Sequence, residues 1–237
     1  ILDLNAGLID VGTLSLQNIG NASLTAKGGD IRGNGTLSMA GDLVLKSAQV
    51  YPTTLGSFEL FAYDHDGIAG SITIQRSGYA GTPLSAGGKL SIYSSNIIQG
   101  GVLRAPLGTI RLGWDGTDLD PADTDLDKPR DLIAGLTIDV PLTSVVSLGE
   151  GSLTSVSAKG LKIPFGISLD GLSWIDPRGV NVTLSGLPDK AVFVSGDSVG
   201  MESGSRVDIS GGGDLLRRHT RPPVSYTHLT LPTNREV

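Results

Sequence analysis

Residues 88–92 read Gly-Lys-Leu-Ser-Ile, a glycine followed by one polar residue and then by apolar and polar residues in alternation. Alternation with a period of two is typical of a strand that buries one face, and glycine between such runs is typical of tight turns. The same pattern occurs at five other places: Gly12-Thr13-Leu14-Ser15-Leu16, Gly35-Thr36-Leu37-Ser38-Met39, Gly56-Ser57-Phe58-Glu59-Leu60, Gly70-Ser71-Ile72-Thr73-Ile74 and Gly108-Thr109-Ile110-Arg111-Leu112. The pattern predicts an all-β protein.

The spacing of these units indicates how the strands are connected. The steps between successive glycines are 23, 21, 14, 18 and 20 residues. A repeat of about twenty residues brings the chain back to the same edge one strand spacing higher, roughly 4.8 Å. Further alternating segments at 22–26, 42–45 and 181–184 fit this scheme. We therefore predict a right-handed parallel β-helix with projecting loops, whereas the irregular step of 14 keeps a β-sandwich or barrel as the alternative.

The composition of the 237-residue chain narrows the classes of function. It contains 34 glycines and no cysteine, only 5% of its residues are aromatic, and its net charge is -6. The absence of cysteine excludes disulfides and thiolate metal sites. No basic stripe with interleaved aromatic residues is present, which argues against binding to nucleic acid. No run of eighteen apolar residues is present, so we expect no segment that inserts into a membrane.

The repeat pattern is interrupted in two places, which sets the expected organisation of the chain. We predict β-helix coils over residues 1–114, an acidic excursion over 115–135, and continued β-helix over 136–216. A loop rich in proline and aromatic residues is expected within this last part, at 162–179. Residues 217–237 are treated separately below.

The acidic excursion is the first candidate for contacts with other molecules. Six aspartates fall within thirteen residues: Asp115, Asp118, Asp120, Asp123, Asp125 and Asp127. Calcium takes oxygen ligands of this kind, but the run matches no EF-hand or glycine-rich calcium repeat, and a solvated acidic loop accounts for it without an ion. We predict a surface-contact loop with no metal or cofactor, and leave calcium binding as the alternative. Trp174, in the second interruption, is either the anchor of a packed loop or a platform for a sugar.

Residues suited to catalysis are scarce. His65 lies in the turn Asp64-His65-Asp66-Gly67, without a Gly-x-Ser-x-Gly nucleophile motif. Parallel β-helices also form the scaffold of polysaccharide lyases and hydrolases, and that alternative would use Arg104, Arg111, Asp115 and Asp139. A hydrolase needs two carboxyl groups at a defined separation, which sequence spacing on a solenoid does not fix. We predict no catalytic residues and no enzymatic activity, with such an enzyme as the alternative.

Three segments resemble the C-terminal conserved region of the filamentous haemagglutinin family. They are residues 100–110 (GGVLRAPLGTI), 163–166 (IPFG) and 204–215 (GSRVDISGGGDL). The resemblance implies a fragment of a large exoprotein of a Gram-negative-type bacterium, secreted or held at the cell surface. It also implies export through an outer-membrane transporter of the two-partner route, and adhesion to glycans or receptors on a host or another surface. It supplies no catalytic residues.

The C-terminal residues depart from this pattern. After Leu215 the chain continues with Arg217-Arg218-His219-Thr220-Arg221, and from Val224 it resembles translated sequencing-adapter sequence. We therefore expect residues from about 217 onward to be non-native and disordered, and we exclude them from the functional argument.

Overall fold

The computed structural model describes residues 1–116, 140–168, 173–183 and 190–219, with the side chains of 217–219 left out. The chain divides into two compact units. The larger unit takes in residues 1–163 and 187–215, and the smaller takes in 164–186 and 216–237. Nearly all of the strands belong to the larger unit, and each unit is described by itself.

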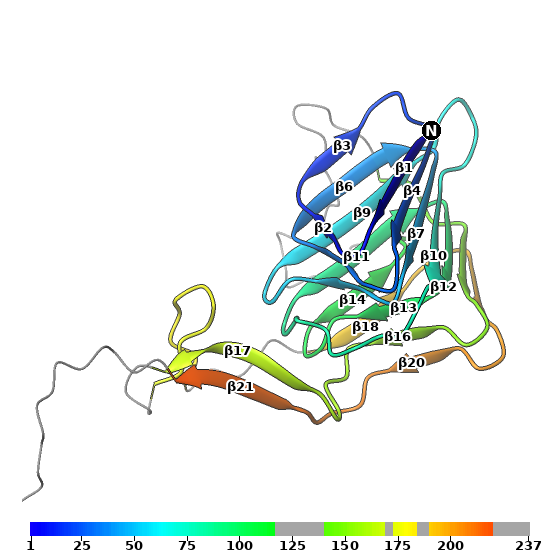
Figure 1. The fold of residues 1–237 in the computed structure, drawn as a ribbon. Coiled ribbons are helices and arrows are strands. Elements are labelled where there is room, and N and C mark those ends of the chain that lie inside the picture. Colours follow the sequence, from blue (N-terminus) through cyan, green and yellow to red (C-terminus); the bar gives the residue numbers. More distant parts are fainter. Residues whose placement is uncertain (117–139, 169–172, 184–189, 220–237) are drawn as a thin grey trace, which may run out of the picture. The chain divides into compact units, whose positions relative to one another are not determined.

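Three parallel sheets build the larger unit (Figure 1). Sheet A contains β1 (Leu2–Ala6), β4 (Asn21–Ala26), β7 (Asp42–Ser47), β10 (Ser71–Arg76), β12 (Asn96–Gly100), β15 (Val145–Leu148) and β19 (Ser198–Met201). Sheet B contains β2 (Ile9–Val11), β5 (Ile31–Gly33), β8 (Val50–Pro52), β13 (Val102–Arg104), β16 (Leu153–Ser155) and β20 (Arg206–Asp208). Sheet C contains β3 (Leu14–Leu16), β6 (Gly35–Ala40), β9 (Ser57–Tyr63), β11 (Lys89–Ser94), β14 (Thr109–Leu112) and β18 (Ala191–Val194).

With one exception, described below, the coils pass through sheets A, B and C in turn, and strands of the same sheet in successive coils pair with each other. All of these pairs are parallel and in register; Leu2 lies beside Ala22, for example, and Ala22 lies beside Leu43. This is a parallel β-helix, which confirms the predicted fold class.

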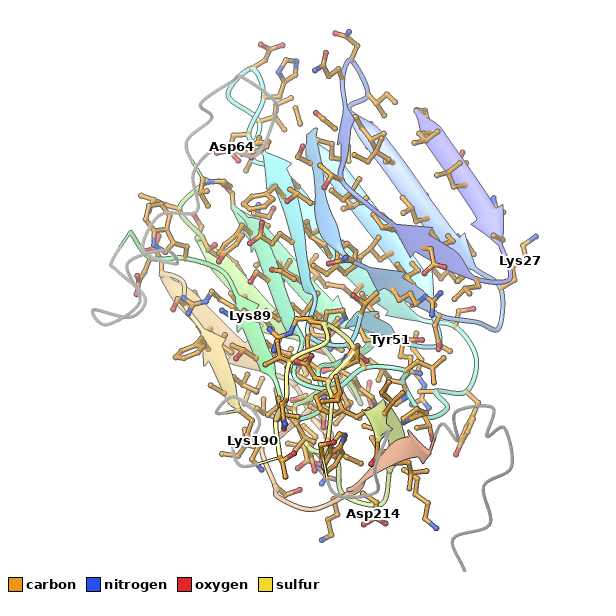
Figure 2. The ribbon with its side chains drawn as sticks, turned by 90° about the vertical axis from the view of Figure 1, so that its left-hand side faces the viewer. Lys27, Tyr51, Asp64, Lys89, Lys190 and Asp214 are labelled. Carbon is orange, nitrogen blue, oxygen red and sulfur yellow. The ribbon has the colours of Figure 1, made fainter. Side chains whose placement is uncertain are left out.

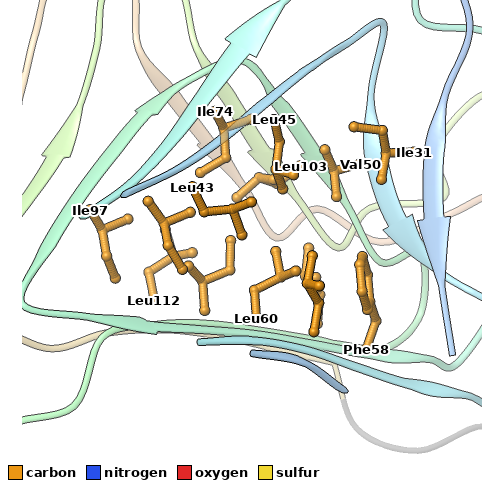
Figure 3. Close-up of a cluster of buried hydrophobic side chains, with 14 of the residues drawn as sticks. Ile31, Leu43, Leu45, Val50, Phe58, Leu60, Ile74, Ile97, Leu103 and Leu112 are labelled. Carbon is orange, nitrogen blue, oxygen red and sulfur yellow. The ribbon is translucent and has the colours of Figure 1, made fainter. Parts of the chain in front are cut away.

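The interior of the coils is filled by columns of aliphatic side chains. Ile31, Val50 and Leu103 occupy equivalent positions in sheet B, and each is fully buried. Columns from sheets A and C meet them in the centre, where Leu45, Ile74, Leu60 and other side chains point toward one another (Figure 3). Because alternate residues of a strand face opposite sides of a sheet, one apolar parity along each strand is enough to build this core.

Glycine is required where the corners of successive coils stack. A Cβ atom on Gly108 would lie 2.0 Å from the carbonyl oxygen of Gly88, and one on Gly41 would lie 2.2 Å from that of Gly20. Neither distance leaves room for a side chain. The high glycine content of the sequence therefore follows in part from coils packed at the spacing of hydrogen-bonded strands.

The sequence suggested that the glycine repeat marks the same corner of every coil. The structure shows that it does not. Five of the six units begin strands of sheet C, but the unit at Gly70 forms β10 in sheet A. The coil from Gly56 to Gly88 is thus 32 residues long, and the irregular step of 14 only measures the distance from one sheet to another. Strands of all three sheets share the same alternation, so periodicity could not distinguish them.

This long coil bypasses sheet B. Residues 77–88, all of which the structure describes, contain no strand, and β8 pairs directly with β13 through Val50 and Leu103. The bypass segment returns to the stack near its end, where the N–H of Gly87 donates to the carbonyl of Pro106 at 2.8 Å and the N–H of Leu55 donates to that of Ala86 at 2.9 Å.

The remaining strands differ from the repeat. Strands β17 (Lys162–Ser168) and β21 (Asp214–His219) form a separate two-stranded sheet. The predicted strand at 181–184 is wrong in its described part, where Asn181 forms only an isolated bridge to Ile175. The boundary expected at residue 217 falls within β21, and residues 220–237 lie outside the described part of the chain.

Replacing Gly33 by alanine tests the tight stacking of coils. A Cβ atom there would lie 2.2 Å from the ring of Phe58, while the backbone of Gly33 suits any residue. Forcing a methyl group into a packed core costs about 1–3 kcal/mol. We expect Gly33→Ala to lower Tm in thermal denaturation by about 3–8 °C. Gly12→Ala is the control, because its Cβ would meet nothing within 4 Å; equal Tm values for the two variants would contradict the packing described.

Candidate functional site

Trp114 and Thr143, which lie on either side of the predicted acidic excursion at 115–135, are hydrogen-bonded to each other. The N–H of Thr143 donates to the carbonyl of Trp114 at 2.8 Å, and the N–H of Trp114 donates to Oγ1 of Thr143 at 3.0 Å. The Thr143 hydroxyl donates in turn to the carbonyl of Ser94 at 2.9 Å, and the N–H of Ser144 donates to that of Ser95 at 2.9 Å. The chain therefore leaves the coil after sheet C and re-enters it at the same corner, and the stacking of β14, β15 and their neighbours is preserved.

An aromatic cluster lies beside this corner, on the outer face of sheet C. We use the term for Phe61, Tyr63, Tyr93 and Val140, which are at most 5% exposed, together with the partly buried Trp114 packed against them. The Phe61 ring stacks on Tyr63 with centroids 5.9 Å apart and on Tyr93 with centroids 5.0 Å apart. Large buried rings of this kind contribute strongly to packing. The cluster thus holds Trp114 and Val140, which lie on either side of the excursion, against the coil.

Polar groups border the aromatic cluster. The outer face of sheet C runs from Lys89, at the start of β11, toward Asp64, just after the end of β9 (Figure 2). Between them Glu59 accepts a hydrogen bond from Oγ1 of Thr36 at 3.2 Å. Burial raises the pKa of the Glu59 carboxyl, and the Thr36 hydrogen bond and the charge of Lys89 oppose this shift only in part.

The two tyrosines and an arginine complete this border. Burial, reinforced by the charge of Glu59, raises the pKa of Tyr63 to about 12. Burial also raises the pKa of Tyr93, against the charge of Arg111 and a hydrogen bond with Ser91. The guanidinium of Arg111 lies 4.5 Å from the centre of the Phe193 ring, a cation–π contact in a side chain only 6% exposed.

The chemistry available here is limited. A carboxyl group with a raised pKa can donate a proton, but glycoside hydrolysis needs a second carboxyl group facing the first. No carboxylate among the described residues contributes to the pKa shift of Glu59. Of the residues considered for an enzyme, Arg111 lies in sheet C and Arg104 in sheet B, so they belong to different faces of the coil. Asp139 lies outside the described residues.

The predicted contact residues are placed only in part. Asp115 is exposed where the chain leaves the coil, next to Trp114. Asp118, Asp120, Asp123, Asp125 and Asp127 lie outside the described residues. Among the residues that are described, no group of three or more His, Cys, Asp or Glu side chains is placed to hold a metal ion. In the same part of the chain, no helix has the length and apolar character needed to cross a membrane.

Trp174 belongs to the smaller unit and packs within it. Its ring meets Phe165 edge to face with centroids 6.0 Å apart, and its indole N–H donates to the Phe165 carbonyl at 2.7 Å. Its backbone N–H donates to Oγ1 of Thr183 at 2.8 Å. These contacts are those of a side chain that anchors a loop.

A buried aspartate holds the next turn of the smaller unit. Asp176 accepts hydrogen bonds from the N–H groups of Arg178 and Val180, both at 2.9 Å, and from the Arg178 guanidinium at 2.7 Å. Burial disfavours the charged form of Asp176, but these hydrogen bonds outweigh it and lower the pKa of the carboxyl. The group is a structural ion pair.

The sequence analysis missed Glu59, Phe61, Tyr63 and Tyr93. A signal for them was present in residues 57–63 (SFELFAY), where Phe58 and Leu60 have one parity and Phe61 and Tyr63 have the other. A strand with large apolar residues on both parities is typical of a sheet covered on both faces. The second apolar face therefore indicated that something packs on the outside of the coil.

Comparisons with known proteins were made at three levels. No protein-family model matches the chain, and neither a curated protein nor a solved structure matches it.

Replacing Thr143 by valine tests the fastening of the excursion. The variant keeps the side-chain shape but leaves the Trp114 N–H and the Ser94 carbonyl without the Thr143 hydroxyl. Each unsatisfied buried group costs about 1–3 kcal/mol. We expect a clear fall in Tm and faster hydrogen exchange at the Trp114 amide. Thr73→Val, on the outer face of sheet A, should change neither; similar behaviour of the two variants would show that the fastening contributes little.

Replacing Glu59 by glutamine tests the electrostatics of the outer face of sheet C. Because the pKa of Glu59 is raised in the folded protein, the protonated carboxyl group favours the folded state at low pH. This contribution to stability is lost as the pH rises through the raised pKa. Glutamine imitates the protonated form and still accepts from Thr36. We expect the variant to exceed the wild type in Tm at pH 7 by about 1–3 °C, and to match it near pH 3.5. A difference independent of pH, or a lower Tm at pH 7, would refute this account; Asp3→Asn is the exposed control.

Proposed function

We propose that the chain is a structural shaft segment of a large secreted bacterial surface exoprotein, and that it mediates attachment through many weak contacts displayed along its length. The observation that carries this proposal is the mutual hydrogen bonding of Trp114 and Thr143. It lets a long insertion leave the β-helix without breaking the stack. A repeat fold that tolerates such insertions is suited to the display of contact residues on a rigid support.

The positions of the segments that resemble filamentous haemagglutinins support a role as scaffold. Residues 100–110 run from the end of β12 through β13 into β14, and residues 204–215 run from the turn before β20 into β21. Residues 163–166 lie in β17. All three segments thus supply strands and turns. By the same resemblance, we propose export through an outer-membrane two-partner transporter and a location outside the cell or on its surface.

The proposed mechanism of attachment is multivalent binding, in which many weak contact sites are held on one molecule. A single weak contact dissociates quickly, but sites held on one rigid support rebind before the whole molecule escapes, which raises avidity by about 10²–10⁴ over the single contact. The proposed partners are glycans or receptors on a host or another surface. The predicted acidic residues 115–127 are the proposed contact loop.

A carbohydrate-active enzyme is the second candidate, and one observation favours it. Glu59 combines a raised pKa with neighbouring tyrosines and a lysine on an outer face of the β-helix, as a general acid for sugar chemistry would. The shaft is preferred because no carboxylate among the described residues acts on the pKa of Glu59, as a catalytic partner facing it would.

Attachment of beads that carry the full chain tests the shaft proposal. Beads coated at several densities are flowed over immobilised glycans and surfaces, and retention is measured. Retention should rise more steeply than in proportion to density. A variant with Asp118, Asp120, Asp123, Asp125 and Asp127 changed to asparagine should lose at least about fivefold in retention, because cooperative binding amplifies the loss of each contact.

A control variant carries the same change in charge elsewhere. It replaces Asp3, Asp66, Asp197 and Asp214 by asparagine and Glu150 by glutamine, all exposed positions. An equal loss of retention in both variants would show that the effect depends on net charge alone. It would contradict the proposal that the loop is the contact site. Turnover of a polysaccharide in a parallel assay, abolished in Glu59→Gln, would replace the shaft by the enzyme.

A further inference from the structure

The outer face of sheet B carries a column of polar residues that the preceding sections leave without a role. In strand order its members are Asp10, Arg32, Tyr51, Arg104, Ser155 and Asp208. Each lies next to an inward core residue, such as Val50 beside Tyr51 and Leu103 beside Arg104. Because neighbours in the column are one strand spacing apart, roughly 4.8 Å, a charged member can pair directly with a charged neighbour.

The charges toward both ends of the column are paired. Arg32 donates from Nε and Nη2 to the two carboxylate oxygens of Asp10, the latter bond measuring 2.8 Å. At the other end Arg206 donates from Nη2 to Asp208 at 2.8 Å, and the N–H of Ser210 donates to the same carboxylate at 3.0 Å. These carboxylates are therefore already neutralised by their own partners.

Arg104, in the middle, has no such partner. Among the described residues its guanidinium forms no hydrogen bond or ion pair, and its Nε is buried without an acceptor. Its neighbours in the column are Tyr51 and Ser155. Serine carries no charge, and Tyr51 stays neutral because burial raises its pKa to about 12. Burial also lowers the pKa of Arg104, and the charges of Asp30 and Asp208 act on it only from a distance.

The nearest carboxylate that is not in an ion pair is occupied as well. Asp30 accepts a hydrogen bond from the side-chain amide of Gln49 at 3.0 Å and interacts with the Tyr51 hydroxyl. A half-buried positive charge that is left unpaired costs stability. An anion bound to the Arg104 guanidinium would remove this cost, and the described residues do not supply one.

Two further side chains frame this charge. Arg76 ends β10, and Tyr79 follows it in the bypass segment. Arg76 pairs with Ser47, and the N–H of Ser77 donates to the carbonyl of Ser47 at 2.7 Å, so the start of the bypass segment lies beside the chain that leads into β8, the neighbour of β13. Both side chains are within electrostatic range of Arg104. Tyr79 is 84% exposed, so its ring is open to a ligand. The site thus presents two guanidinium groups and one open aromatic face.

We propose that Arg104, Arg76 and Tyr79 bind a carboxylated sugar unit of an acidic polysaccharide. The planar guanidinium of Arg104 matches the two oxygens of a uronate carboxylate. The ring of Tyr79 offers an apolar surface for the C–H face of the sugar. The site lies on sheet B, whereas the proposed contact loop leaves the corner after sheet C, so this proposal deepens the attachment function but can fail or succeed independently of that loop.

Binding of oligogalacturonate to the full chain tests the proposal by isothermal titration calorimetry. The fully methyl-esterified oligosaccharide and inorganic sulfate serve as comparison ligands. We expect binding of the free acid that Arg104→Gln weakens at least tenfold and Tyr79→Ala weakens severalfold. Arg206→Gln, which removes an exposed arginine that is already paired, should change affinity less than twofold.

The opposite outcomes are equally distinct. Equal affinity for the methyl ester, or sulfate that competes as strongly as the uronate, would overturn a site for carboxylated sugars. Loss of binding in Arg206→Gln as large as in Arg104→Gln would also overturn it. Arg104→Met separates binding from folding: removal of an unpaired charge should leave Tm unchanged or raise it, and a marked fall in Tm would show that Arg104 has a structural role instead.

Discussion

The whole structure depends on one constraint, the hydrogen bonding of each coil to the next at the spacing of parallel strands. This pairing sets every residue beside its counterpart one coil away, so each position becomes a column. Inward columns must be apolar and of matched size, as in the series of Ile31, Val50 and Leu103. At the corners the same spacing brings backbone atoms so close that only glycine fits, as at Gly108 above Gly88. The matched inward columns and the glycines at the corners thus both result from the spacing of hydrogen-bonded strands.

The sequence predicted this fold because the constraint acts on neighbouring residues, whose alternation can be read directly. It did not reveal which sheet a strand joins, since Gly70 begins the same pattern in sheet A that the other units begin in sheet C. The candidate sites were harder to predict, because they depend on contacts between distant segments. Phe61 and Tyr63 are buried in one cluster with Val140, which lies far along the chain. Arg104 is unpaired because the carboxylates of Asp10, Asp30 and Asp208 bind other side chains. The acidic residues 118–127 lie outside the described part of the chain, so their role as a surface-contact loop stays a prediction.

Outward positions escape the constraint and can differ from coil to coil. In sheet C they carry rings that hold a neighbouring segment, with Glu59 and Arg111 at the border. In sheet B they carry charges, most of which are paired. The interior therefore determines the fold, while the outer faces determine which groups the β-helix presents to other molecules. Because the interior alone determines the fold, the outer faces of one β-helix can differ in chemistry.

The coil that bypasses sheet B has a consequence for the axis of the β-helix. In sheet A, β10 stands between β7 and β12, whereas in sheet B the strands of the same coils, β8 and β13, are direct neighbours. Over this interval the side formed by sheet B is shorter by one strand spacing, roughly 4.8 Å. We expect a stack that lacks one strand on one side to bend toward that side, which here is the side of sheet B. A dozen residues that leave one sheet are thus expected to change the direction of a β-helix while its core stays the same.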